Sequence, residues 1–141
     1  MTQRALLLDT HVWYWLVMGD ERLGKRARSH IARAAKEQRV AVSAISSYEL
    51  SAKARKGKLE LRPDPDEWLR RAGTQPGISM IQVDREIMAR AASLPLQHGD
   101  PADRMLIATA LFYDLELVTA DRVILDVARQ NRALQVFDAG R

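Results

Sequence analysis

The chain has 141 residues, a length that fits one domain with a hydrophobic core of its own. It contains no cysteine, which excludes disulfides, thiolate zinc sites and cysteine nucleophiles. The formal net charge is +4. A basic surface of this kind can bind a polyanion, and the alternative is that it only keeps the protein soluble. No run approaches the roughly 20 apolar residues of a membrane span, and the N-terminus lacks the pattern of a signal peptide, so we expect a cytoplasmic protein without membrane association.

Apolar runs alternate with helical patterns along the whole chain. Residues 5–8 predict a buried strand, followed by a strongly apolar helix over 11–18 and an amphipathic basic helix over 23–38. The later predicted elements are strands over 40–44, 78–83, 115–119 and 134–137, and helices over 46–56, 66–71, 84–93, 100–111 and 121–130. Apolar strands separated by helices are typical of a parallel sheet covered on both faces. We therefore predict one α/β domain over residues 1–141, a three-layer α/β/α sandwich with a central, mostly parallel sheet of four to five strands.

Four acidic residues stand close to the predicted carboxyl ends of strands. Asp9 ends the first strand, Asp121 lies just beyond the fourth, and Glu49 falls in the first turn after the second. Asp103 lies in the first turn of the helix that Asp100 opens. Parallel sheets place their ligands at this edge, so we expect the four acids to meet there. Carboxylates gathered in one place repel each other unless a cation joins them, and hard oxygen ligands favour Mg²⁺, with Mn²⁺ as a substitute.

Each acid also has a simpler interpretation as a helix cap. Residues 46–49 match a capping box in which Ser46 is the N-cap and Glu49 reaches back to it. Asp9, Asp100 and Asp121 can cap the helices that follow them. Capping is the commoner role for any one acid taken alone. The joint pattern favours a metal site, because Ser, Thr and Asn cap equally well and an acid is not needed each time.

A site built from carboxylates and Mg²⁺ has no covalent nucleophile, so its natural chemistry is metal-assisted hydrolysis of a phosphodiester. We expect Asp9 and Asp121 to be direct ligands. Glu49 and Asp103 are expected to bind the metal, hold its waters or accept a proton from the attacking water. No GxxxxGK[ST] loop is present, which argues against a P-loop NTPase.

Three further residues stand near the predicted site. Thr10 and Thr119 are expected to hydrogen-bond the carboxylates and fix their orientation. His98 lies close to Asp100 in the sequence, where a role in the loop is the simpler interpretation.

Four segments together resemble the PIN-domain ribonucleases, and specifically the VapC-like toxins of toxin–antitoxin pairs. They are LLLDTHVWYWL, SAISSYELSAKARKGKLEL, HGDPADRMLIATAL and LVTADRVI, in the family's order and spacing. The resemblance implies an α/β/α sandwich and Mg²⁺-dependent endoribonuclease activity on RNA. It maps the family's acids onto Asp9, Glu49, Asp103 and Asp121, with Asp100 as a supporting acid.

The same resemblance implies a homodimer and inhibition by a cognate antitoxin protein. Trp13, Trp15, Leu16 and Met18 form an apolar stretch beside Asp9 that could receive an antitoxin helix, and ordinary core packing is the alternative for part of it. Two other functions stay open at this point. One is a PIN-type nuclease of RNA processing or structured DNA, and the other is a non-enzymatic partner-binding module whose acids are only caps.

Overall fold

The computed structural model describes residues 3–97 and 99–141, so His98 lies outside the described residues. Along the chain the elements are β1 (Leu6–Leu8), α1 (Thr10–Met18), α2 (Lys25–Lys36), β2 (Val40–Ser43), α3 (Ala44–Arg55), α4 (Pro65–Gly73), β3 (Ile78–Ile81), α5 (Arg85–Ser93), α6 (Pro101–Tyr113), β4 (Glu116–Thr119), α7 (Arg122–Gln130) and β5 (Gln135–Asp138). The predicted alternation of strands and helices is therefore confirmed.

The sheet has the strand order β3-β2-β1-β4-β5, and every pair of neighbours is parallel. β1 lies in the centre, with Leu7 opposite Ala41 of β2 on one side and Leu117 of β4 on the other. A central strand is covered on both faces, which explains why Leu6–Leu8 is apolar throughout. The order also brings the carboxyl ends of β1, β2 and β4 side by side, where the candidate acids follow.

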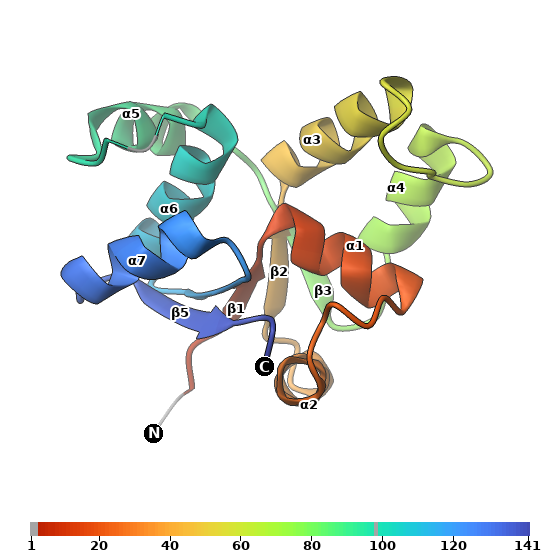
Figure 1. Ribbon diagram of the computed structural model, residues 1–141, viewed down its shortest axis with the longest axis horizontal. Helices are drawn as coiled ribbons and strands as arrows, with labels where there is room; N and C mark the ends of the chain where they lie inside the picture. The colour runs from red at the N-terminus through yellow and green to blue at the C-terminus, as the bar shows by residue number, and fades with distance from the viewer. Residues whose placement is uncertain (1–2, 98) are drawn as a thin grey trace.

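Two hydrophobic layers enclose the sheet. Leu6 and Leu8 point to one face and pack in the same cluster as residues of α1, α2 and α4, including the fully buried Trp13. Leu7 points to the opposite face and packs with α6 and α7, and α5 packs against α6. Figure 1 shows α6 and α7 on one side of the sheet and α1 and α2 on the other. The predicted three-layer α/β/α sandwich is confirmed.

One glycine allows two elements to approach closely. Gly77, just before β3, has a φ of +82°, a conformation that side chains rarely adopt. A Cβ atom at this position would lie 2.3 Å from the carbonyl oxygen of Ala35 near the end of α2. Only glycine fits between α2 and the start of β3 in this arrangement.

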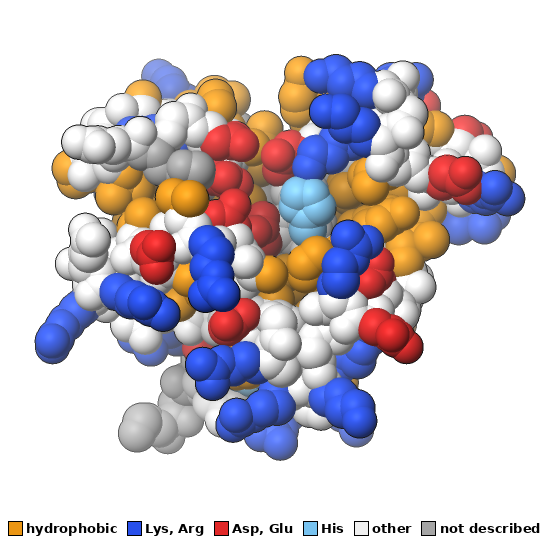
Figure 2. Space-filling model, in the orientation of Figure 1, with side chains coloured by type: hydrophobic (Ala, Val, Ile, Leu, Met, Phe, Trp, Pro, Cys, Tyr) orange, Lys and Arg blue, Asp and Glu red, His pale blue; other side chains and the backbone are white. Residues whose placement is uncertain are grey.

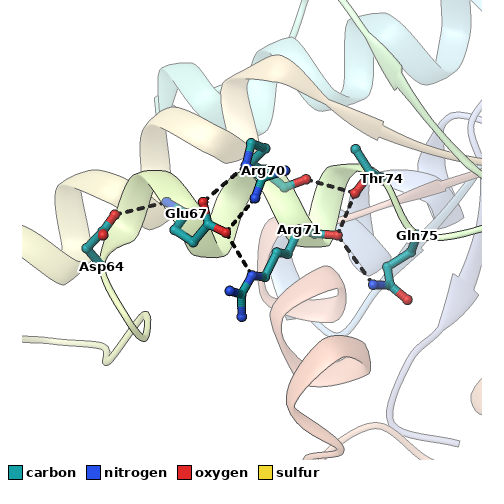
Figure 3. Close-up of polar contacts among 6 residues, drawn as sticks. All are labelled: Asp64, Glu67, Arg70, Arg71, Thr74 and Gln75. Atoms are coloured by element: carbon teal, nitrogen blue, oxygen red, sulfur yellow. Dashed lines mark hydrogen bonds and ion pairs between the residues drawn. The ribbon is translucent and has the colours of Figure 1, made fainter.

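The surface of α4 illustrates how most exposed arginines of this chain are neutralised. Asp64 caps the helix by accepting from the Glu67 amide at 2.9 Å. The carboxylate of Glu67 in turn accepts from Arg70 and from Arg71, the latter at 2.9 Å (Figure 3). Exposed pairs such as these contribute little to stability. No helix within the described residues is long and apolar enough to cross a membrane.

Candidate active site

Asp9 is a buried carboxylate at the end of the central strand. Its Oδ1 accepts a hydrogen bond from the Thr10 amide at 2.7 Å, and its Oδ2 accepts one from the Thr119 hydroxyl at 2.6 Å. Burial raises the pKa of Asp9 above its usual value; the bonds from Thr119 and Thr10 oppose this rise, and the charge of Asp121 adds to it. The side chain is thus held firmly in one orientation while its negative charge is only partly compensated.

The start of α3 differs from the prediction, and the difference changes the role of Glu49. The helix begins at Ala44, with Ser43 as its N-cap, and the Ser43 hydroxyl accepts from the Ile45 amide at 3.1 Å. The predicted capping box of Ser46 and Glu49 is therefore wrong. Because β2 ends at Ser43 and the chain passes directly into the helix, Glu49 lies in the second turn, where it cannot reach the N-cap amide.

A chain of hydroxyl groups holds Glu49 instead. The Thr10 hydroxyl donates to Oε1 of Glu49 at 2.5 Å, and it also lies 2.7 Å from the Ser46 hydroxyl. Since Thr10 has one hydroxyl proton and gives it to Glu49, Ser46 must be the donor to Thr10. Burial raises the pKa of Glu49, and the charges of Asp103 and Asp9 raise it further. Ser46 is fully buried, and its part in this chain was not predicted.

Asp100 and Asp103 come from the first turn of α6, as predicted. Asp100 is the N-cap, and its Oδ1 accepts from the Ala102 amide at 2.9 Å. Pro101 follows at the first helical position. Asp103 is partly buried, and its charge contributes to the raised pKa of Glu49, which places the two carboxylates within electrostatic reach of each other.

The segment that precedes Asp103 is held by its neighbour, Arg104. The guanidinium of Arg104 donates to four carbonyl oxygens between residues 91 and 96, at distances of 2.8–3.3 Å. These carbonyls belong to the end of α5 and the chain beyond it. The partly buried guanidinium of Arg104 thus ties the end of α5 to the turn that carries Asp103.

Asp121 caps α7 and is linked to Asp9 through Thr119. Its Oδ1 accepts from the Val123 amide at 2.8 Å and the Ile124 amide at 3.2 Å. The Asp121 amide donates to the Thr119 hydroxyl at 3.0 Å, and the same hydroxyl donates to Asp9. Both capping bonds use one carboxylate oxygen, so capping leaves the other oxygen of Asp121 for a further partner.

A lysine and a histidine that the sequence reasoning did not bring together border the acids. The Lys53 ammonium donates to Nε2 of His11 at 2.8 Å. An ammonium group can only donate, so Nε2 of His11 is the acceptor. Burial lowers the pKa of His11, and the neighbouring charge of Lys53 lowers it further. Lys53 follows Glu49 by four residues and therefore lies on the same face of α3. That spacing is the one signal in the sequence that could have identified it.

The acids share one recess without forming a closed cage. Figure 2 shows acidic side chains gathered in a hollow between the side of the molecule built from α5, α6 and α7 and the side built from α1 and α3. Among residues 3–97 and 99–141, no three Asp, Glu, His or Cys side chains are grouped so that they could hold a metal ion among themselves. This arrangement still fits Mg²⁺, which usually binds through one or two carboxylates and completes its shell with water and substrate phosphate.

Fold and sequence comparisons now define the class of protein. A family model described as "PIN domain" matches residues 6–130, and the chain belongs to the PIN-domain family. Ribonuclease VapC22 from Mycobacterium tuberculosis (strain ATCC 25618 / H37Rv) is 35% identical over 119 residues, which cover 84% of this chain and 88% of that protein. The resemblance to VapC-like members predicted from the four sequence segments is therefore confirmed.

Solved structures share the same fold at lower identity. VapBC2 from Rickettsia felis, solved bound to a promoter DNA fragment, has a TM-score of 0.68 at 15% identity over 94% of this chain and 97% of that one. FitAcB from Neisseria gonorrhoeae has a TM-score of 0.66 at 22% identity over 95% of this chain and 97% of that one. At these identities the likeness establishes the fold.

Proposed function

We propose that this protein is a Mg²⁺-dependent endoribonuclease and the toxin of a toxin–antitoxin pair. The observation that carries the proposal is the buried Asp9, oriented by Thr119 and held beside other acids in a molecule 35% identical to a protein named as a ribonuclease. Burial of a charged carboxylate is costly, and a divalent cation at this edge would offset that cost.

Asp9 and Asp121 are the carboxylates we assign as metal ligands, with Asp103 and Glu49 as further ligands or as partners of metal-bound water. Mg²⁺, or Mn²⁺ in its place, supplies a Lewis acid that polarises a phosphate oxygen and acidifies water. The donor set fits such an ion because all four side chains offer hard oxygen atoms. The second oxygen of Asp121, which capping does not use, supports this assignment.

The chain's own residues orient the reactants and move the proton. Thr119 and the Thr10 amide hold the Asp9 carboxylate still, and the Thr10 hydroxyl does the same for Glu49. Glu49, with its raised pKa, accepts a proton from the attacking water as the water oxygen bonds to phosphorus. The bond between phosphorus and the leaving oxygen breaks, the leaving oxygen takes a proton from water, and Glu49 returns its own proton to the solvent. Lys53 places a cation at the same edge, where it can contact the phosphate.

We further propose a cytoplasmic homodimer that a cognate antitoxin inhibits. Tyr48 is 72% exposed on α3 and Met18 is 50% exposed on α1, so apolar surface is available on both helices. Of the apolar stretch beside Asp9, Trp13 is fully buried and belongs to the core, while Trp15 and Leu16 are partly exposed. An amphipathic antitoxin segment that covers this surface would also reach the neighbouring acids.

Cleavage of RNA by the purified protein tests the enzymatic part of the proposal. Wild-type protein with Mg²⁺ is expected to cut structured RNA, and EDTA or the Asp9→Asn substitution is expected to abolish the cutting. Equal cleavage by wild type and Asp9→Asn would show that the carboxylate site is not the active site. The alternative in which the four acids act only as helix caps leaves two contacts unexplained. Glu49 caps nothing within the described residues, and Oδ2 of Asp9 binds Thr119.

Growth assays separate a toxin from a nuclease of RNA processing. Expression of the wild-type protein is expected to arrest growth, and co-expression of the small protein encoded beside it is expected to restore growth. Arrest without rescue would favour the RNA-processing alternative.

A further inference from the structure

An arginine-lined hollow runs between α7 and β5, away from the recess of the acids. It has a volume of about 550 Å³. We call it the arginine groove, lined by the side chains Arg122, Arg129, Arg132 and Arg141 together with Leu134 and Val136. These arginines are four of the seven basic residues after position 71, so their concentration here does not follow from the charge of the chain as a whole.

The spacing along α7 brings the arginines to one side of the helix. Arg122 and Arg129 are seven residues apart, which is close to two helical turns, and Leu125 and Ala128 between them also line the groove. Arg132 continues the same direction in the turn before β5. β5 is the last strand of the sheet order, so its outer edge faces this groove unpaired by any strand of the described chain.

The arginines of the groove are poorly neutralised in comparison with others on the surface. Arg129 approaches Asp126, and Arg141 approaches Asp138, each at 3.8 Å. Within the described residues, neither Arg122 nor Arg132 forms an ion pair. Five exposed arginines elsewhere form close ion pairs of 2.6–3.0 Å, namely Arg4, Arg22, Arg62, Arg71 and Arg90, whereas Arg26, Arg33 and Arg85 form none within the described residues. Positively charged side chains that lie close together with few acidic partners favour the binding of an anion.

The groove is separate from the recess of the acids, but its Arg122 end lies next to that recess. Arg122 directly follows Asp121, whose backbone amide binds Thr119 at the acid edge. α7 has nine residues and is therefore about 13 Å long, so the groove extends from the site by roughly that distance. Figure 2 shows basic side chains over α7 and β5 on the same face as the acidic hollow.

We propose that the arginine groove binds the phosphodiester backbone of single-stranded RNA on one side of the scissile bond, an inference that rests on the proposed ribonuclease function. Guanidinium groups match phosphate oxygens in geometry and charge. The partly exposed apolar side chains of Leu125 and Val136 between the cations offer surface to unpaired bases, a combination typical of sites for single strands.

Binding of a labelled single-stranded RNA of about 16 nucleotides, measured by fluorescence anisotropy in EDTA so that nothing is cut, tests the inference. The triple variant Arg122→Ala/Arg129→Ala/Arg132→Ala is expected to raise Kd at least about tenfold. The slope of log Kd against log salt concentration should fall by about 2, because each lost phosphate contact lowers it by roughly 0.7. The matched control, Arg70→Ala/Arg71→Ala/Arg85→Ala, removes the same charge from exposed positions on α4 and α5 and is expected to change Kd less than about twofold.

Cleavage kinetics with Mg²⁺ separate this inference from the proposed function. The groove variant is expected to raise KM for the long RNA with kcat nearly unchanged, and to leave cleavage of an RNA of about 4 nucleotides at the wild-type rate. If wild type cleaves RNA and both triple variants bind the long RNA equally well, the groove assignment is wrong while the nuclease stands. If wild type neither binds nor cleaves RNA, the proposed function itself fails.

The alternative role for these arginines is protection of the exposed edge of β5 against pairing with another chain. In that case the groove variant would self-associate in light scattering and retain its affinity for RNA, which would overturn the proposal. Circular dichroism of each variant confirms that it is folded before binding is compared.

Discussion

Replacing Asp9 with asparagine is expected to stabilise the metal-free protein while it removes cleavage. The Asp9 carboxylate is 6% exposed, and burial raises its pKa despite hydrogen bonds from Thr119 and Thr10. The folded state therefore prefers the uncharged form of this side chain more than water does. Asparagine is close in shape and carries no charge. Its carbonyl oxygen can still accept from the Thr10 amide, and the Thr119 hydroxyl can rotate to accept from its amide group.

The expected gain follows from two opposing contributions. A hydrogen bond to a charged group contributes about 1.5–3 kcal/mol and a neutral one about 0.5–1.5 kcal/mol, so the variant loses about 1 kcal/mol or more for each of the two bonds. Desolvation of a buried ion costs several kcal/mol, and repulsion between Asp9 and Asp121 adds to that cost. Burial raises the Asp9 pKa, so desolvation outweighs the bonds in direction, and the typical magnitudes above leave a net gain on the order of 1 kcal/mol. For a domain of this size the corresponding rise in Tm is about 3 °C.

Thermal unfolding followed by circular dichroism at pH 7 in EDTA measures this gain. Asp84→Asn is the matched control, since Asp84 caps α5 from an exposed position and asparagine caps about equally well. Its Tm is expected to stay within about 1 °C of wild type. Addition of Mg²⁺ should then raise the Tm of wild type more than that of Asp9→Asn, because an ion that binds only the folded state stabilises it. A fall of several degrees for Asp9→Asn in EDTA would refute the reasoning, since the charged carboxylate would then be a net source of stability.

Three other predictions concern the same edge and the core. Glu49→Gln is expected to abolish RNA cleavage with a change in Tm below about 3 °C, because Glu49 is not a cap; a large loss of stability with activity retained would contradict this. The free energy of unfolding of the metal-free protein, measured in urea, should fall as pH rises from the ordinary carboxyl pKa values of 3.8 and 4.5, because Asp9 and Glu49 bind protons more tightly in the folded state. This fall should be shallower in Asp9→Asn. An equal dependence on pH in both proteins would contradict the role given to Asp9. Gly77→Ala should cost at least about 2 kcal/mol in urea unfolding, from its positive φ and the contact with the Ala35 carbonyl, whereas Gly57→Ala, with a φ of +75° and open space around it, should cost only about 1 kcal/mol.

Most of the architecture was within reach of sequence reasoning because it depends on repeated patterns. The apolar run over residues 5–8 predicted a buried strand, and the rule for parallel sheets then placed Asp9 and Asp121 at one edge. The cap formed by Asp100 was equally predictable, since Pro101 after an acid is a local signal for the start of a helix.

The details of the site depend on contacts that no local pattern specifies. Three serines in residues 43–47 were each chemically able to cap α3, and only the point at which β2 leaves the sheet selects Ser43. That shift moved Glu49 from the first turn to the second and changed its partner to the Thr10 hydroxyl. The contact of Lys53 with His11 joins residues 42 positions apart, and two side chains on different helices have no shared periodicity to reveal it.

The bond between Thr119 and Asp9 has a consequence for the timing of synthesis. The two residues are 110 positions apart, and β4, which carries Thr119, is a direct neighbour of the strand that ends at Asp9. A nascent chain that has not yet exposed residues up to Asp121 therefore lacks a strand of the sheet, the hydroxyl that orients Asp9 and the second proposed metal ligand. On the ribosome the proposed nuclease stays inert until residue 121 has emerged, and a contact between residues this far apart in sequence is expected to form late in folding.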